Sequence, residues 1–202
     1  MRTLIVLAHP DPASLTQAVA ARIAAAVQTA DPANVVEIAD LAAEGFDPSF
    51  GAGDIAHFRH RVPPPADVLA EQARIDRADA LVLVYPVYWW SMPGQLKGWI
   101  DRVFVNGWAY EERDDGSVAK LLGRLRVHLV GIGAADDGVY ERHGYGRAMR
   151  TQIDHGIFGY CGAPVLTSDV LLPSAAPFPA SALARAGDIG RSIAAGAIAA
   201  AA

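Results

Sequence analysis

The chain is short of cysteine and carries no excess of positive charge. Cys161 is the only cysteine among 202 residues, so no internal disulfide can form and a cysteine-based metal site would lack ligands. This cysteine usage fits a reducing, cytoplasmic compartment. The formal net charge is −5 and the sequence pI is about 5.6. Binding to nucleic acid needs a basic surface, so this composition argues against a nucleic-acid partner.

Long hydrophobic runs are also missing. The apolar run at residues 4–8 is interrupted by His9 and Pro10, and the alanine-rich tail at residues 193–202 is short. Neither approaches the roughly 18 apolar residues of a membrane span, so we expect no membrane insertion. Together with the single cysteine and the acidic charge, we expect no metal site and no nucleic-acid partner. With 52% hydrophobic residues, the sequence predicts one globular domain over residues 1–202.

Three well-known site motifs are absent. No G-x-G-x-x-G follows the first apolar run, which argues against a tight Rossmann dinucleotide site. No G-x-x-x-x-G-K-[ST] is present, which excludes a P-loop nucleotidase. Ser14 and Ser91 lack the G-x-S-x-G context of a hydrolase nucleophile.

What the chain does contain is an alternation of continuous apolar runs and amphipathic segments. Such runs are typical of parallel strands that are covered on both faces. We expect an α/β fold: an open, doubly wound, five-stranded parallel sheet with helices on both faces and its ligand beyond the carboxyl ends of the strands. The predicted strands cover residues 3–8, 35–38, 80–85, 125–133 and 165–171, and the main helices follow residues 14 and 93 or cover residues 67–78, 148–160 and 180–199.

Three long connections interrupt this alternation. Residues 41–65 are rich in Gly, Pro, Asp and His and are predicted to form a surface excursion. Residues 106–123 contain a hairpin-like turn signal at Asp114-Asp115-Gly116-Ser117. Residues 134–147 are predicted to form a polar loop. Connections of this length in a small domain are usually functional or mobile.

The first strand runs into a loop that suits an anion. Between His9 and Ser14 two prolines prevent helix formation, and Ser14 then stands where a helix N-cap belongs. Backbone N–H groups at a helix N-terminus favour a phosphate. The alternative is that Ser14 only caps the helix and His9 only ends the strand.

The third strand runs into an aromatic loop. Tyr85, Tyr88, Trp89 and Trp90 lie within six positions, in a segment stiffened by prolines. They could form an interface patch or a core cluster, but two adjacent tryptophans cannot both face one core. A phosphate at the first loop and a flat ring at the second together indicate a nucleotide-like cofactor, and a flavin suits this geometry.

The residues that carry these features also resemble a known family, the flavodoxin-fold NAD(P)H:quinone oxidoreductases of the diaphorase type. The resemblance runs from LIVLAHPDPASLT through DVLAEQARIDRADALVLVYPVYWWSMPGQLKGWIDRVF to GYCGAPVL. It implies a flavodoxin-like fold and a homodimer with the flavin at its interface. It also implies ping-pong hydride transfer from NAD(P)H to flavin N5 and then to a quinone or similar acceptor.

The resemblance implies roles for particular residues. Trp108 and Tyr110 resemble the hairpin segment that reaches the partner's substrate pocket, and Tyr140, with His143 or Tyr145, resembles the pair that stabilises the reduced flavin. His143 comes early for that match, so Tyr145 or Arg147 could substitute, and a solvated loop histidine is the alternative. The implied cofactor contacts are His9, Ser14, Leu15, Thr16, Pro86, Val87, Tyr88, Trp89, Trp90, Gly131, Ile132, Gly133 and Tyr140.

Two positions depart from the family pattern. Thr16 stands where the family often has Asn. The fourth predicted strand ends in Gly131-Ile132-Gly133-Ala134, where Thr-Thr-Gly-Gly is common, so hydroxyl groups are replaced there and backbone donors remain.

The sequence thus predicts a flavin-dependent NAD(P)H oxidoreductase. A flavodoxin-like electron carrier and a regulatory subunit of a membrane transport system remain alternatives. The flavin is FMN or FAD, with FMN favoured slightly. The choice between NADH and NADPH depends on basic side chains whose positions the sequence leaves open: Arg59, Arg61, Arg113 and Arg147.

Overall fold

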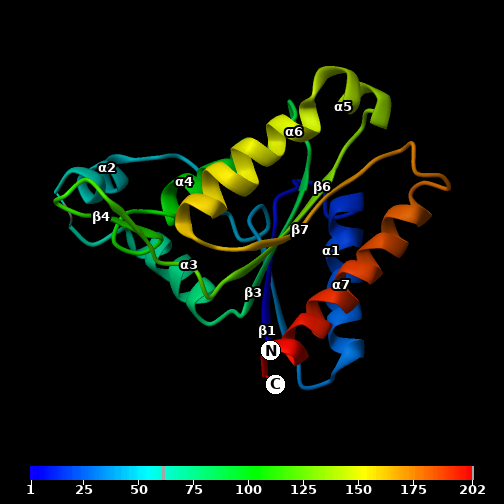
Figure 1. The fold of residues 1–202 in the computed structure, drawn as a ribbon, viewed down its shortest axis with the longest axis horizontal. Coiled ribbons are helices and arrows are strands. Elements are labelled where there is room, and N and C mark those ends of the chain that lie inside the picture. The colour runs from blue at the N-terminus through cyan, green and yellow to red at the C-terminus, as the bar shows by residue number, and fades with distance from the viewer. Residues whose placement is uncertain (61, 202) are drawn as a thin grey trace.

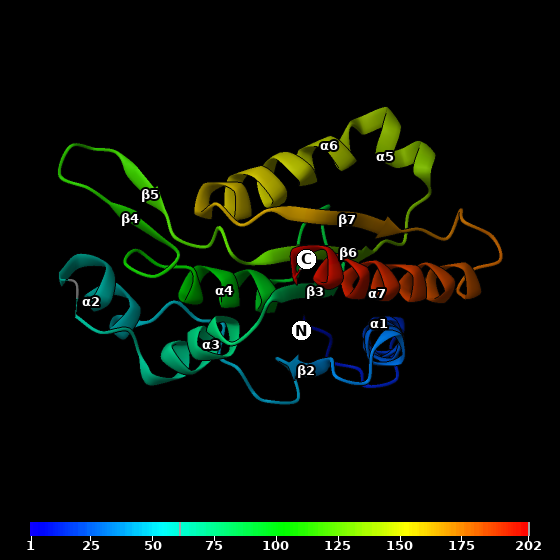
Figure 2. The same cartoon turned by 60° about the horizontal axis from the view of Figure 1, so that its bottom comes forward.

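Five parallel strands form the central sheet of the protein, in the order β2-β1-β3-β6-β7 (Figures 1 and 2). The structure is a computed structural model that describes residues 1–60 and 62–201. Arg61, one of the four candidate basic residues, therefore lies outside the described residues. The prediction of a doubly wound five-stranded sheet is confirmed. The strands are β1 (Arg2–Leu7), β2 (Val35–Asp40), β3 (Ala80–Pro86), β6 (Arg126–Ile132) and β7 (Val165–Leu171).

Helices cover both faces of this sheet. On one face lie α1 (Leu15–Ala30) and α7 (Ala180–Ala201), which stand together on the right of Figure 1. The other face carries α3 (Ala66–Asp76), α4 (Gly94–Val103) and a helical segment made of α5 (Asp137–His143), α6 (Tyr145–Met149) and the π-helix η1 (Arg150–Gly159). Beyond that layer lie α2 (Ala52–His60) and the antiparallel hairpin of β4 (Tyr110–Glu112) and β5 (Val118–Lys120).

The central strand β3 is buried along its whole length, because both of its faces are covered. Leu81, Leu83 and Tyr85 pack into the core beneath α4 and η1. Val82 and Val84 pack into the second core, beneath α1 and α7. The uninterrupted apolar run in the sequence is the direct result of this two-sided burial.

The two helices of the second core approach each other closely. A β-carbon at Gly190 of α7 would lie 2.6 Å from the β-carbon of Ala26 and 2.7 Å from the carbonyl oxygen of Ile23 in α1. Only a residue without a side chain fits there. The Ala- and Gly-rich composition of α7 is therefore a packing requirement of this seam.

The predicted polar loop at residues 134–147 is wrong, because most of it is helical. Asp136 caps α5 by accepting a hydrogen bond from the Val139 N–H at 2.9 Å. Gly144 then ends α5 in the left-handed conformation, with φ of 67°, and the chain continues into α6. The predicted helix at residues 148–160 is present, but its bonding is π-helical over residues 150–159.

The excursion at residues 41–65 contains the unpredicted helix α2 and is held to the domain by Arg102. This guanidinium is buried in α4 and contacts the Asp54 carboxylate at 3.1 Å and the Asp67 carboxylate at 2.6 Å. It also donates to the Asp47 carbonyl oxygen at 2.8 Å and lies over the Phe46 ring. A buried charge is tolerated in a protein only when it is paired and hydrogen-bonded in this way.

The sequence prediction for α4 is confirmed in detail. Leu96, Ile100, Val103 and Phe104 are buried, and Lys97 pairs with Asp101 at 2.6 Å on the outer face. Within the described residues, no helix combines the length and apolar character that crossing a bilayer would require.

The first prediction concerns Gly98 of α4, against which the excursion packs. A β-carbon at Gly98 would lie 2.9 Å from the Pro48 α-carbon and closer still to its carbonyl oxygen. We expect Gly98→Ala to lower the free energy of unfolding by about 1–3 kcal/mol through overpacking, despite the better helix propensity of Ala. Gly94→Ala is the matched control, because a β-carbon there has no neighbour within 4 Å. Equal urea midpoints for the two variants would contradict the close contact.

The second prediction concerns His128 of β6, which is buried and lies 3.0 Å from the Thr167 hydroxyl. Burial lowers the pKa of His128 to about 4. The unfolded chain, with a histidine pKa of about 6.5, therefore binds a proton between these values that the folded chain does not. Stability should fall by up to about 3 kcal/mol as the pH drops through this window. Urea unfolding of His128→Gln should show a flatter profile, and parallel profiles for variant and wild type would refute the assignment.

Candidate functional site

Three loops leave the sheet at the same edge because three neighbouring strands end together. Leu7 of β1 lies opposite Val84 of β3, and Pro86 of β3 lies opposite Ile132 of β6. The Val87 N–H continues this ladder by donating to the Ile132 carbonyl oxygen at 2.8 Å. The loops that begin at His9, Val87 and Gly133 are therefore brought to one edge, as the sequence predicts.

The loop after β1 leads into the N-terminus of α1. Ser14 is the N-cap, and its hydroxyl oxygen accepts a hydrogen bond from the Gln17 N–H at 3.3 Å. The Ala18 N–H bonds to the Ser14 carbonyl oxygen. Of the first four N–H groups of the helix, those of Leu15 and Thr16 remain available for an outside acceptor. Their dipoles favour a negatively charged group.

His9 stands beside this helix terminus with a defined donor. Its Nδ1 atom accepts a hydrogen bond from the Asp11 N–H at 3.0 Å. A ring nitrogen that accepts cannot carry the proton, so the neutral ring is protonated at Nε2, which can donate. The side chain of Thr16 is buried, so Thr16 would contact a ligand through its backbone N–H.

The loop after β3 makes an unusually tight turn at the two tryptophans. Tyr88 and Ser91 exchange two backbone hydrogen bonds, at 3.1 and 3.0 Å. Trp89 and Trp90 occupy the two central positions with φ of 50° and 54°. This left-handed pair is the pattern of a type I′ turn, which normally selects Asn-Gly. The conformation costs roughly 1–2 kcal/mol per residue for bulky side chains, and such strain is commonly found at functional sites.

The turn places its two tryptophans in different surroundings. The Trp89 side chain is 89% exposed. Trp90 is partly buried and stacks on Tyr145, with ring centroids 3.8 Å apart and planes 23° apart. His143 also stacks on Tyr145, with ring centroids 5.2 Å apart. The two tryptophans therefore do not share one core, as the sequence predicts.

The stack depends on the corner between α5 and α6. Tyr145 sits between Gly144 and Gly146, and Gly144 needs its left-handed φ of 67° to reverse the chain direction there. The sequence indicates Tyr145 and His143 as candidates. It does not predict that they stack with Trp90, because the only local sign is the pair of glycines on either side of Tyr145.

The loop after β6 lies against Tyr140. A β-carbon at Gly133 would lie 2.8 Å from the Tyr140 hydroxyl oxygen, so this hydroxyl reaches the end of the strand. Burial raises the pKa of Tyr140. The phenol therefore stays protonated at neutral pH and can donate a hydrogen bond. Gly131 also has little space, because a β-carbon there would lie 3.0 Å from the Val87 side chain.

A contact missed by the sequence reasoning holds the aromatic turn in place. The Ser91 hydroxyl donates to the Gln152 side-chain oxygen of η1 at 3.0 Å. Residues 61 positions apart in the chain carry no local sign of such a bond. Together with the Val87–Ile132 bond, it ties the turn to both β6 and η1.

Trp108 and Tyr110 are not brought to this edge. The Trp108 indole N–H lies 3.3 Å from the Asp76 carboxylate, and its ring packs edge-on against Phe104. Tyr110 packs against Tyr160 at 5.1 Å. Figure 2 shows the hairpin that carries Tyr110 at the opposite end of the molecule from α5. Arg59 of α2, Arg113 in the turn between β4 and β5, and Arg147 of α6 are exposed and lie on separate segments.

The geometry fits a flavin better than a smaller guest. The N-terminus of α1 offers two backbone N–H groups and the His9 ring to a phosphate. The Trp89-Trp90 turn offers a rigid aromatic wall, and the end of β6 brings the Tyr140 hydroxyl to the same edge of the sheet. One edge of the sheet thus offers sites for the anionic end and the planar end of the same molecule.

The chain matches a family model described as a flavodoxin-like fold over residues 1–188. An uncharacterized NAD(P)H oxidoreductase of Haemophilus influenzae is 32% identical over 163 residues, which cover 80% of this chain and 79% of that protein. An FMN-dependent NADH:quinone oxidoreductase of Polaromonas naphthalenivorans is 30% identical over 161 residues, covering 74% of this chain and 71% of that protein.

A solved structure shares the architecture over nearly its full length. The NAD(P)H:quinone oxidoreductase from Methanothermobacter marburgensis superimposes with a TM-score of 0.83 and 25% sequence identity. The similarity covers 96% of this chain and 98% of that one.

The third prediction concerns Tyr145, which covers one face of Trp90. We expect Tyr145→Ala to uncover the indole, shifting tryptophan emission to longer wavelength and increasing its quenching by acrylamide. Tyr145→Phe should leave both readings unchanged, because a phenyl ring keeps the stack. Equal quenching in Tyr145→Ala and wild type would mean that the stack does not persist in solution.

Proposed function

The chain belongs to the flavodoxin-like fold family, and from this premise we propose that it is a flavin-dependent NAD(P)H oxidoreductase with a quinone or related electrophilic acceptor. The observation that carries the proposal is the convergence of an anion-binding helix terminus and a rigid aromatic wall at one sheet edge. The names of the relatives from Haemophilus, Polaromonas and Methanothermobacter agree with this activity.

FMN is the flavin that the proposal favours. The Polaromonas relative is named as FMN-dependent. In this chain, the backbone N–H groups of Leu15 and Thr16, the Ser14 cap and the His9 ring would hold the terminal phosphate. The absence of a G-x-G-x-x-G turn agrees with a cofactor that presents a single phosphate rather than a pyrophosphate.

The aromatic turn would hold the flavin ring. Pro86 and Val87 continue the strand, and the turn from Tyr88 to Trp90 follows as a preformed wall. The backbone of Gly131, Ile132 and Gly133 would face the polar edge of the ring. Hydroxyl side chains common in the family are missing there, and the Gly133 N–H already donates to the Leu171 carbonyl oxygen at 3.0 Å, so main-chain donors to the ring would come from the loop beyond Gly133.

When bound, the flavin supplies the hydride chemistry, and the protein supplies orientation and electrostatics. Tyr140 would donate a hydrogen bond to the polar edge of the ring, because its phenol is protonated at neutral pH. Tyr145 and His143 would line the face on which the nicotinamide and the acceptor bind in turn, with Arg147 at the rim. Holding the reacting atoms in contact contributes a large part of the rate in such reactions.

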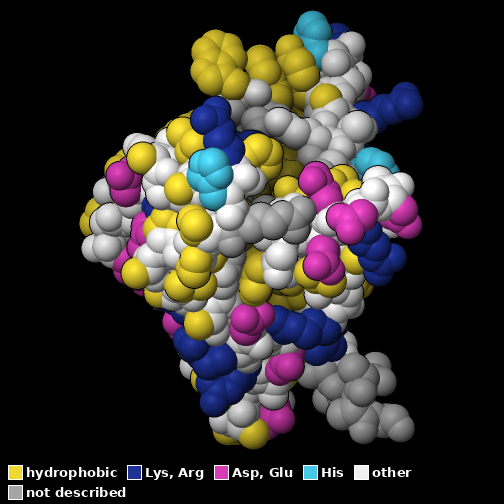
Figure 3. All heavy atoms as spheres, turned by 90° about the vertical axis from the view of Figure 1, so that its left-hand side faces the viewer, with side chains coloured by type: hydrophobic (Ala, Val, Ile, Leu, Met, Phe, Trp, Pro, Cys, Tyr) yellow, Lys and Arg dark blue, Asp and Glu magenta, His cyan; other side chains and the backbone are white. Residues whose placement is uncertain are grey.

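We also propose a homodimer that completes the pocket. An apolar cavity of about 590 Å³ lies between α2 and the start of the hairpin, where Phe50, Phe58 and Tyr110 reach the surface. Figure 3 looks onto this side and shows hydrophobic side chains around a hollow. Pairing through this face would carry Tyr110 and the Trp108 segment toward the partner's flavin. This explains why neither residue lies at the site of its own chain.

The fourth prediction tests the activity. The purified protein should bind one FMN per chain. In the absence of oxygen, NADH or NADPH alone should bleach the flavin absorption at least as fast as the enzyme turns over. Trp89→Gly should retain less FMN while keeping or raising the melting temperature, because glycine relieves the left-handed strain and the exposed indole adds little to the core. A protein that binds no flavin would refute the proposal, and a melting temperature lowered as for a core tryptophan would return Trp89 to a structural role.

The second candidate function is a flavodoxin-like electron carrier. A carrier would hold the flavin but would not be bleached by NADH or NADPH alone, so the same rapid-mixing experiment separates the two. The Tyr145 and His143 cover over Trp90 favours the enzyme, since hydride transfer needs a face shielded from water. Residues 41–65 are the surface to probe for the further alternative, a regulatory subunit.

The fifth prediction tests the dimer. Phe58, which is 68% exposed, should be buried on association. We expect Phe58→Asp to convert the dimer to a monomer in light-scattering chromatography, because a charge would be buried without a partner. Leu166→Asp on β7 is the matched control, since Leu166 is also exposed but lies on the far edge of the sheet. A monomeric wild type, or equal dissociation by both variants, would refute this interface.

A further inference from the structure

A cavity of about 550 Å³ lies at the β7 edge of the sheet, between η1 and the edge strand β7. Its inner wall is apolar and includes Met149, Ile153 and Leu172. The first turns of α7 close it from the other side. Its volume is within the range of small-molecule sites, about 300–1,000 Å³. Neither Trp90 nor Tyr145 lines it, so it is separate from the aromatic stack.

Two groups of opposite charge line this cavity without contacting each other. The half-buried carboxylate of Asp154 accepts a hydrogen bond from the Ser168 hydroxyl of β7 at 3.1 Å. Arg150 stands four residues earlier on η1 and lines the same cavity. Among the ion pairs formed by residues 1–60 and 62–201, none includes either of them.

The pair stands on the π-helix η1, in which each N–H bonds to the carbonyl five residues before it. Arg150 and Asp154 belong to the first turn of η1. π-Helical turns are rare and are frequently found at functional sites.

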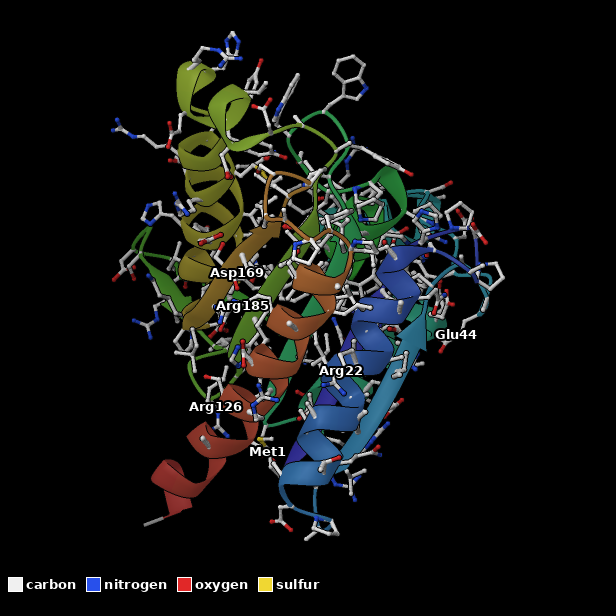
Figure 4. All side chains as sticks on the ribbon, turned by 90° about the vertical axis from the view of Figure 1, so that its right-hand side faces the viewer. Met1, Arg22, Glu44, Arg126, Asp169 and Arg185 are labelled. Carbon is white, nitrogen blue, oxygen red and sulfur yellow. The ribbon has the colours of Figure 1, made fainter. Side chains whose placement is uncertain are left out.

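The other charged groups around the cavity already have partners. Arg185 of α7 pairs with Asp169 of β7 at 2.7 Å, and Figure 4 shows the two side chains facing each other between these elements. The Ser174 hydroxyl donates to the Asp137 carboxylate at 2.9 Å. Asp137 is exposed to solvent, so the half-buried carboxylate on this wall without an ion pair is that of Asp154, and the guanidinium without one is that of Arg150.

These two groups define the chemistry of the guest. A carboxylate that is partly withdrawn from water and has a single hydroxyl partner favours a cationic hydrogen-bond donor. A guanidinium favours a planar carboxylate, which it can bind through two parallel hydrogen bonds. The burial that raises the pKa of Asp154 would be offset by a bound ammonium group. A molecule with only one of the two charges would leave either the half-buried Asp154 without an ion partner or the exposed Arg150 with water alone.

We propose that this cavity binds a small amino-carboxylate zwitterion, namely an α-amino acid with an apolar side chain. Its ammonium group contacts Asp154 and Ser168, and its carboxylate contacts Arg150. Its side chain lies against Met149, Ile153 and Leu172. Tyr140 and Gly146 also line the cavity, so a bound amino acid touches the α5–α6 segment from behind the proposed flavin site.

The test is titration calorimetry of the flavin-loaded protein with L-phenylalanine, repeated with two analogues of matched size. Phenethylamine keeps the ammonium group and lacks the carboxylate, and 3-phenylpropionate keeps only the carboxylate. We expect saturable binding of L-phenylalanine and at least about tenfold weaker binding of each analogue, because each loses one charge-assisted contact. Phenethylamine that binds as tightly as L-phenylalanine would overturn the zwitterion assignment, and so would an absence of heat for all three.

Variants locate the binding. Asp154→Asn and Arg150→Gln should each weaken L-phenylalanine binding by about tenfold or more. Asp114→Asn and Arg142→Gln are the matched controls, because both residues are exposed and outside the cavity wall. Melting temperature and flavin content verify that each variant is folded. Unchanged affinity in both cavity variants would refute the site, whereas loss of flavin binding alone would concern only the proposed oxidoreductase.

Discussion

The register of the central strand β3 is the constraint on which the site depends. β3 is hydrogen-bonded to β1 on one side and to β6 on the other. The pairing with β6 extends over seven residue pairs. A shift by one residue would exchange its two buried faces, which are both apolar but of different volume. It would also move the aromatic turn by about 3.3 Å relative to its neighbours. The relative positions of the phosphate loop, the ring wall and the glycine-rich strand end are thus set first by backbone pairing in the sheet, and the Ser91–Gln152 and Trp90–Tyr145 contacts then hold the aromatic turn.

A second level of organisation uses buried charge. Arg102 gathers the Asp54 and Asp67 carboxylates and the Asp47 carbonyl oxygen, and Arg74 gathers the carboxylates of Glu37, Glu44 and Glu71. Arg102 thereby connects the excursion at residues 41–65 to α4, and Arg74 connects Glu44 of the same excursion to α3. Apolar packing alone would leave this polar segment without a defined position. The cavity beneath Phe58, and with it the proposed dimer face, therefore rests on these ion pairs.

The sequence was informative wherever apolar periodicity was strong. The five strands, the inward stripe of α4 and the helix cap at Ser14 follow from local patterns that tertiary contacts reinforce. The sequence was misleading at residues 134–147. The glycines and charged residues there suggest a loop, but the Asp136 cap and the left-handed Gly144 bound a short helix. The burial of Arg102 depends on partners 35 to 55 positions away, so no local pattern could reveal it. The left-handed turn at Trp89-Trp90 contradicts residue preference outright, and only the tertiary bonds around it account for that conformation.

That turn has a kinetic consequence. The strain of two left-handed tryptophans is held by bonds within the chain, from Val87 to Ile132 and from Ser91 to Gln152. A planar molecule that binds this turn therefore does not have to select one loop conformation from many. Capture of the ring should then be a single second-order event whose observed rate rises linearly with ligand concentration, without the plateau that a slow rearrangement of the loop would impose.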